Sequence, residues 1–244
     1  MRILLIIFIS FLTTFSSYGQ MSIGLVGEPT LNITKVGDSP QDESKTLESL
    51  KTKDYTLGLG VEIRKQIDRY TSITFIPGYQ QSNMLLVKED LHLFDIIHPQ
   101  IPEIRDFAQA AQKNAYLHYR HAYAGTQVIY AKKLRVRTSD SKLGFEIGGG
   151  LGAFLLIKDD IKVRTEGFAV NGNYTQTIDD STGLDARPFL VNLSAIADLN
   201  YRATPSVHVF AGAKLTAPLT SASTSLPKIT IFTPALRLGL RYIL

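Results

Sequence analysis

The sequence of 244 residues contains no cysteine, no tryptophan and only 3 methionines. Without cysteine the chain has no disulfide framework, no Cys-ligated zinc or iron–sulfur site and no thiol nucleophile. After the first 19 residues it also lacks any run near the roughly eighteen apolar residues that a membrane-spanning helix needs. The net charge of +4 comes without a cluster of Lys and Arg. We therefore expect no nucleic-acid partner.

The first residues have the pattern of an export signal. Arg2 forms a short charged region, residues 3–15 are apolar, and the small residues Ser17 and Gly19 stand as in a signal-peptidase site. The apolar run is too short to span a bilayer. We therefore predict a signal peptide over residues 1–19, cleaved after Gly19, and a mature domain over residues 20–244.

The rest of the chain alternates between apolar and polar residues with a period of two. Strict alternation over such lengths predicts half-buried β-strands and not helices. In the strand around residues 116–137 the apolar phase changes near Ala124-Gly125, where we expect a β-bulge. The predicted strands cover residues 23–34, 55–63, 73–79, 116–137, 143–155, 189–201, 207–215 and 236–244.

The connections between these strands alternate in length. Short turns near residues 68–69, 138–141 and 202–206 alternate with long segments. This pattern is typical of outer-membrane barrels, which have short periplasmic turns and long extracellular loops. We predict an all-β fold, an eight-stranded antiparallel up-and-down transmembrane β-barrel with long extracellular loops. The long segments are residues 35–53, 83–114, 158–187 and 219–228.

The less apolar strand face consists mostly of Gly, Ser, Thr and Asn, with a few charges of both signs. The exposed strands of a soluble protein usually carry many Lys and Glu, so this face suits a crowded lumen better. A secreted, soluble, lipocalin-like barrel remains the alternative. Buried charges need partners of opposite sign. We expect a lumen network of Glu62, Arg64, Glu146, Asp198, Lys214, Arg237 and Arg241.

Tyrosines near the predicted strand ends fit the aromatic girdles at the two membrane interfaces. Outer-membrane lipid is therefore one expected partner. The tyrosines in question are Tyr55, Tyr70, Tyr79, Tyr116, Tyr201 and Tyr242.

The second long loop is unusually apolar. Pro102 opens a stretch whose apolar residues recur at helical spacing, which predicts a short helix. This helix either packs over the barrel rim or forms a partner-docking surface, since a structureless loop of roughly thirty residues would be uncommon and usually functional. The candidate docking residues are Leu85, Leu86, Phe94, Ile97, Ile104 and Phe107.

The third long loop contains Asn171-Gly172, a strong hairpin-turn signal. The two neighbouring strands either continue outward as one projecting hairpin with its tip at Asn171-Gly172, or the segment is an irregular loop.

The sequence contains no motif for catalysis or cofactor binding in its required structural context. The pattern Gly148-x-Gly150-x-x-Ala153 matches a dinucleotide fingerprint but lies inside a strand, without the strand–turn–helix context. His118 and His121 are three residues apart, so a regular strand places them on opposite faces. Where lipid A deacylases carry His-x-Ser, this chain has Tyr123 in the serine position. We predict no enzyme, no metal and no cofactor.

The chain resembles the small outer-membrane β-barrel proteins of Bacteroidetes, the PorT-like or outer membrane protein beta-barrel domain group. The resemblance rests on the signal ending before Gln20, on residues 57–61 (LGLGV), on the glycine-rich strand 143–155 and on residues 238–244 (LGLRYIL). It implies a β-barrel fold and an outer-membrane location. The apolar loop over residues 85–112 and the possible hairpin favour a non-enzymatic barrel whose extracellular loops contact envelope or secretion-system proteins. A small-molecule or lipid-binding barrel, or a narrow channel, is the alternative function.

Overall fold

The computed structural model describes residues 20–37, 53–88, 114–134, 142–169, 172–178, 186–224 and 228–244. The predicted signal peptide lies outside these residues. No helix in the described part of the chain is long and apolar enough to cross a membrane. The described residues form nine strands: β1 (Met21–Gly37), β2 (Lys53–Gln66), β3 (Thr71–Lys88), β4 (Asn114–Leu134), β5 (Leu143–Ala169), β6 (Gly172–Ile178), β7 (Phe189–Arg202), β8 (Val207–Pro218) and β9 (Lys228–Ile243).

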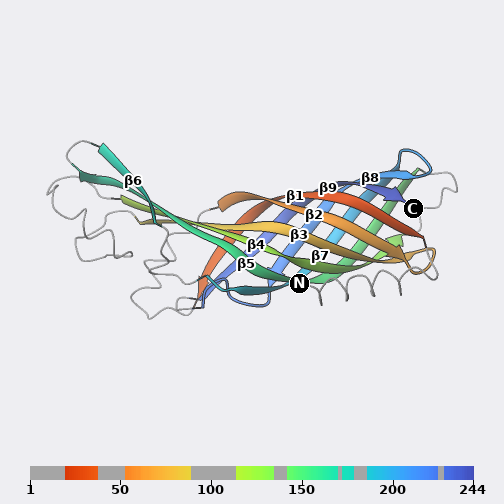
Figure 1. The fold of residues 1–244 in the computed structure, drawn as a ribbon, viewed down its shortest axis with the longest axis horizontal. Coiled ribbons are helices and arrows are strands. Elements are labelled where there is room, and N and C mark those ends of the chain that lie inside the picture. The colour runs from red at the N-terminus through yellow and green to blue at the C-terminus, as the bar shows by residue number, and fades with distance from the viewer. Residues whose placement is uncertain are drawn as a thin grey trace, which may run out of the picture.

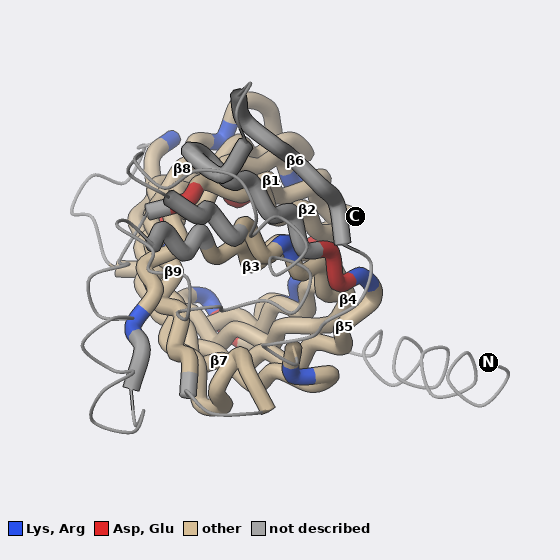
Figure 2. Tube along the Cα trace, turned by 90° about the vertical axis from the view of Figure 1, so that its left-hand side faces the viewer, with Lys and Arg blue, Asp and Glu red and all other residues tan. Residues whose placement is uncertain are grey.

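Eight of these strands close into a barrel, and every pairing is antiparallel. β1 to β5 pair in chain order, β5 pairs with β7, and β7 to β9 continue the sheet until β9 pairs with β1. The view along the long axis shows the strands surrounding a common interior (Figure 2). β6 is outside this circle and pairs with β5. The predicted eight-stranded antiparallel barrel is confirmed.

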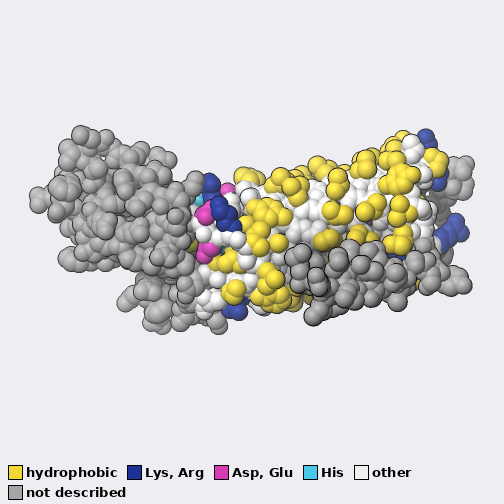
Figure 3. Space-filling view, in the orientation of Figure 1, with side chains coloured by type: hydrophobic (Ala, Val, Ile, Leu, Met, Phe, Trp, Pro, Cys, Tyr) yellow, Lys and Arg dark blue, Asp and Glu magenta, His cyan; other side chains and the backbone are white. Residues whose placement is uncertain are grey.

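The outward face of the barrel is a belt of exposed apolar side chains, which Figure 3 shows over the described surface. Leucines on six strands are 45–66% exposed although they lie in the middle of regular strands. Tyr55, Tyr201 and Tyr242 are exposed near strand ends, whereas Tyr79 lies well inside the longer β3. The leucines of the belt are Leu25, Leu57, Leu59, Leu151, Leu155, Leu193, Leu199, Leu215, Leu236, Leu238 and Leu240.

The structure has a register shift close to the bulge predicted near Ala124-Gly125, but the extra residue belongs to β5 and not to β4. β3 and β4 pair without a break along this region. The register shifts between β4 and β5 instead, at Ala122/Tyr123, and the extra residue is Ile157 of β5. The apolar phase of β4 changes because Tyr119 and Tyr123 point inward and are fully buried, with exposed fractions of 0%.

One side of the barrel continues beyond its rim. β3 and β4 remain paired as far as Lys88 and Ala115, and β5 continues past the barrel to pair with β6. Figure 1 shows this extension, formed by the far ends of β3, β4 and β5 together with β6, at the end away from the C-terminus. Ala169 pairs with Gly172, so the structure contains the projecting hairpin and not an irregular loop. Its connection is residues 170–171, one residue earlier than expected and outside the described residues.

Gly125 of β4 lies where β4 and β5 approach closely. A Cβ atom there would lie 2.1 Å from the Ala153 carbonyl oxygen and 2.6 Å from the Phe154 Cα. Because both are backbone atoms, we expect Gly125→Ala to push the strands apart and lower the free energy of unfolding by about 1–3 kcal/mol. Urea titration of the folded barrel, followed by gel mobility, measures this. The control is Gly149→Ala, whose Cβ would meet only the Ser194 oxygen at 3.5 Å. Equal losses in both variants would contradict the steric explanation.

Candidate functional site in the barrel lumen

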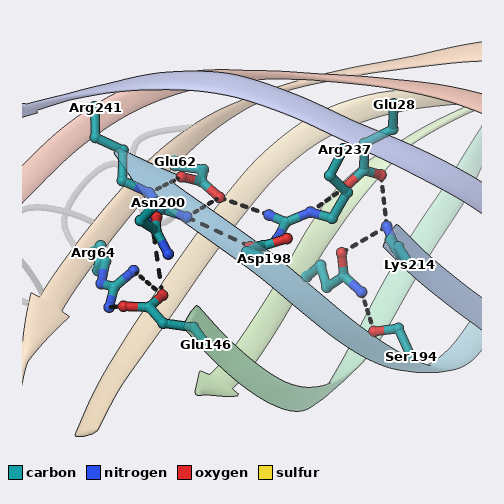
Figure 4. A network of polar contacts seen from close by, with 11 residues as sticks. Glu28, Glu62, Arg64, Glu146, Ser194, Asp198, Asn200, Lys214, Arg237 and Arg241 are labelled. Carbon is teal, nitrogen blue, oxygen red and sulfur yellow. Dashed lines mark hydrogen bonds and ion pairs between the residues drawn. The ribbon is translucent and has the colours of Figure 1, made fainter. Parts of the chain in front are cut away.

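Arg237 of β9 is the centre of a buried network of charges. Its Nε donates to Glu28 Oε1 at 3.1 Å and its Nη2 donates to Glu62 Oε1 at 2.7 Å, while its Nη1 donates to Asp198 Oδ2 (Figure 4). Arg237 is 1% exposed. One guanidinium therefore joins β1, β2, β7 and β9 across the interior, using the fixed fork of donors that only arginine offers.

Arg241 extends the network toward the barrel end that carries the short turns. Its Nε donates to Glu62 Oε2 at 2.6 Å, and its Nη1 donates to Asn200 Oδ1 at 2.5 Å. The guanidinium carbon lies 3.9 Å from the centre of the Phe210 ring, a cation–π contact. Arg237 and Arg241 are four residues apart on one strand, so their side chains share a face of the sheet. Both are buried, and this face is the lumen side.

Two further ion pairs complete the network. Arg64 of β2 binds Glu146 of β5 through both guanidinium nitrogens, at 2.7 and 2.6 Å. Lys214 of β8 donates to Glu28 Oε2 at 2.6 Å and to Gln127 Oε1 at 2.9 Å. Bidentate and charge-assisted hydrogen bonds of this kind are stronger than hydrogen bonds between neutral groups.

The structure brings all seven predicted charged residues into the lumen, together with Glu28, which the sequence analysis missed. Four carboxylates (Glu28, Glu62, Glu146 and Asp198) face four cations (Arg64, Lys214, Arg237 and Arg241). The signal for Glu28 is its even position in β1, which it shares with the inward-facing Ser22, Val26 and Asn32.

Side chains fill the lumen around this network. Glu62, Asp198 and Arg237 are each at most 1% exposed. An apolar cluster of buried side chains packs beside them, and it comes from β1, β3, β4, β7 and β8. The interior is thus a packed core with a balanced charge cluster, as expected for a barrel of eight strands. The cluster consists of Val26, Ile76, Ile129, Ala131, Ile196 and Phe210.

The two histidines of β4 each contact a different carboxylate near the end of the barrel that carries the extension. His118 Nε2 lies 2.8 Å from Asp54 Oδ2, and His121 Nε2 lies 3.1 Å from Asp159 Oδ1. The buried ring of Tyr123 lies edge-on to His121. Within the described part of the chain, no three His, Asp or Glu side chains are grouped as they would be around a metal ion.

The candidate docking residues fall mostly outside the described residues. Leu85 and Leu86 lie in β3, in register with His118 and Leu117 of β4. Phe94, Ile97, Ile104 and Phe107 lie outside the described residues, as does the predicted helix after Pro102.

The chain was compared with known proteins. No family model matches it, and no curated protein matches its sequence. Among solved structures, Neisserial surface protein A is similar over 91% of this chain and 96% of its own, with 10% identity and a TM-score of 0.43. Ail of Yersinia pestis is similar over 92% of this chain and 99% of its own, with 12% identity and a TM-score of 0.35. The N-terminal β-barrel domain of Pseudomonas aeruginosa OprF covers 92% and 100%, with 12% identity and a TM-score of 0.34. At these levels of similarity, none of the three assigns an activity to this chain.

Proposed function

We propose that this chain is an integral outer-membrane β-barrel protein with a closed lumen that acts by contacting envelope or secretion-system proteins on its extracellular side. The observation that carries the membrane part is the apolar belt around a polar, filled interior. In this arrangement the turns at residues 67–70 and 203–206 lie in the periplasm and the extension lies outside the cell. The export signal would be cleaved after Gly19.

The belt favours the membrane over the soluble lipocalin-like alternative. Soluble monomers rarely expose contiguous apolar patches larger than a few hundred Å². Here exposed leucines recur around the barrel, from Leu25 on β1 to Leu240 on β9. Heat-modifiable gel mobility after outer-membrane fractionation tests this location. Recovery of folded protein in the soluble periplasm would contradict it.

The filled lumen argues against the narrow-channel alternative. The ion pairs of Arg237 and Arg241 cross the interior from β9 to β2 and β7, and the apolar cluster packs beside them. We therefore expect the folded protein to be electrically silent in planar lipid bilayers, because an ion would have to displace buried salt bridges. The positive control is a porin inserted under the same conditions. Reproducible single-channel steps from folded wild-type protein would contradict a closed lumen.

The extension supports a role in protein contacts. Beyond the rim, β3, β4, β5 and β6 form one sheet, and β6 is an outer strand with β5 as its partner in the described part of the chain. An outer strand offers backbone donors and acceptors along its free side, which is a common basis for strand addition by a partner. Because the extension would lie outside the membrane, an envelope or secretion-system protein is the partner that we propose.

In-cell crosslinking tests this contact. We would compare wild type with a variant lacking residues 161–178 and a second variant lacking residues 89–113. Heat-modifiable mobility checks that each barrel still folds. We expect at least one deletion to remove a crosslinked envelope partner that wild type retains. The same partners in all three proteins would contradict the proposal.

A further inference from the structure

The barrel end that carries the short turns contains a cavity of about 350 Å³. We call it the basic vestibule, and its walls come from three sides. Arg64 and Arg69 line it from the β2–β3 side, Lys133 and Lys142 from the β4–β5 side, and Arg202 from the β7–β8 side. The volume lies in the range of small-molecule sites.

The vestibule differs from the network above it in its charge balance. Among the described residues, its walls carry six cations and a single carboxylate, that of Glu146. Arg64 already binds both oxygens of that carboxylate. Clustered charges of one sign in a hollow raise the local concentration of ions of the other sign. The six cations are Arg64, Arg69, Lys133, Lys142, Arg202 and Arg241.

The strand register builds this arrangement. Arg202, His208 and Arg241 are direct cross-strand neighbours on β7, β8 and β9. On the β4–β5 side, Lys133 is in register with Glu146 and its side chain lies over Gly144, where an added Cβ would come within 3.0 Å of the lysine Cε and 3.5 Å of its Nζ. The absence of a side chain at Gly144 therefore leaves room for the ammonium group of Lys133 at the cavity wall.

One buried donor at the vestibule has no hydrogen-bond partner in the part of the chain that the structure describes. Asn200 is 8% exposed, and its Oδ1 accepts from Arg241, but its Nδ2 has no hydrogen-bond partner among the described residues. His208 Nε2 is likewise buried and without a partner there. An unsatisfied buried donor lowers stability, because it has lost its hydrogen bonds to water without gaining others. An acceptor oxygen on a ligand in the cavity would satisfy Asn200.

We propose that the basic vestibule is an anion-binding site for a phosphate-bearing ligand. Cations approach from three walls, and a tetrahedral phosphate presents acceptor oxygens in several directions, whereas a carboxylate presents two oxygens in one plane. The cavity is large enough for a phosphorylated small molecule. The same phosphate chemistry is offered by a soluble organic phosphate and by the headgroup of an anionic lipid. The site depends on the folded barrel and not on the extracellular contacts proposed above.

Calorimetric titration of the detergent-folded full chain with inorganic pyrophosphate tests the site, in a phosphate-free maltoside detergent. We expect binding that weakens as salt is raised, and at least a tenfold increase in Kd for the double variant Lys133→Gln, Arg202→Gln. The matched control is Lys35→Gln, Arg120→Gln, which removes the same charge from exposed positions toward the other end of the barrel. The control is expected to bind as wild type does.

The double variant Lys142→Gln, Arg69→Gln tests the same cavity independently. The proposal therefore stays testable if the first double variant does not fold. Absence of pyrophosphate binding by wild type, or equal Kd values in the vestibule and control variants, would overturn the proposal. Nanodiscs of phosphatidylcholine with and without phosphatidic acid then separate the two ligand sources. Weaker pyrophosphate binding in the presence of phosphatidic acid supports a lipid headgroup in the site, and unchanged binding supports a soluble phosphate.

Discussion

Replacement of Arg237 by glutamine is expected to leave almost no folded barrel. The guanidinium contacts Glu28, Glu62 and Asp198, and none of these carboxylates is more than 14% exposed. Removal of one partner of a buried ion pair costs about 3–5 kcal/mol, because the remaining charge is left uncompensated. Here three carboxylates lose a partner at once. The combined loss of folding free energy is therefore comparable with the whole stability of a typical domain, about 5–15 kcal/mol.

Refolding yield and urea titration, read by heat-modifiable mobility and circular dichroism, measure this effect; the chain has no tryptophan for fluorescence. Arg237→Lys keeps the charge but loses the fork of donors, so an intermediate loss is expected. The double variant Arg237→Gln, Glu28→Gln restores the balance of charges and should recover part of the stability. Wild-type stability in the Arg237→Gln variant would show that the network does not hold the barrel together.

Replacement of Leu236 by arginine should also have a large effect, because it adds an unpaired charge to the apolar outer face. Leu236 lies in the middle of β9, points outward and is 60% exposed. If the belt faces lipid, Leu236→Arg places a charge near the bilayer midplane and should cost about 2–4 kcal/mol. On a soluble barrel, the same substitution on an exposed side chain would be nearly neutral.

Unfolding in lipid vesicles distinguishes these outcomes. The matched control is Leu219→Arg, because Leu219 is equally exposed but directly follows the end of β8. Near the interface the cost should fall to about 0–1 kcal/mol. Equal stability of both variants in lipid would contradict the assignment of the belt to the membrane.

Much of the barrel could be predicted because the alternation of side chains is a local property. Once Leu236, Leu238 and Leu240 are assigned to the outer face, Arg237 and Arg241 must point inward. Glu28 escaped prediction because its neighbours Gly27 and Pro29 interrupt the apolar alternation of β1.

The remaining features depend on register, which a single sequence does not specify. The Asn171-Gly172 turn signal indicated a projecting hairpin, but the extra residue Ile157 and the exact register of β5 with β6 arise from how two strands align. The basic vestibule has the same origin. Its cations come from short segments next to several different turns, and the pairing of β4, β5 and β7 brings Lys133, Lys142 and Arg202 to one cavity.

The unbroken course of β5 has a mechanical consequence. This strand of 27 residues runs from the turn end, between β4 and β7, through the barrel and into the extension. A pull on the far end of the hairpin along the strand direction would load many backbone hydrogen bonds of β5 in shear at the same time, so that no single bond has to bear the force alone. An outward pull on the extension would thus be resisted by the whole barrel wall.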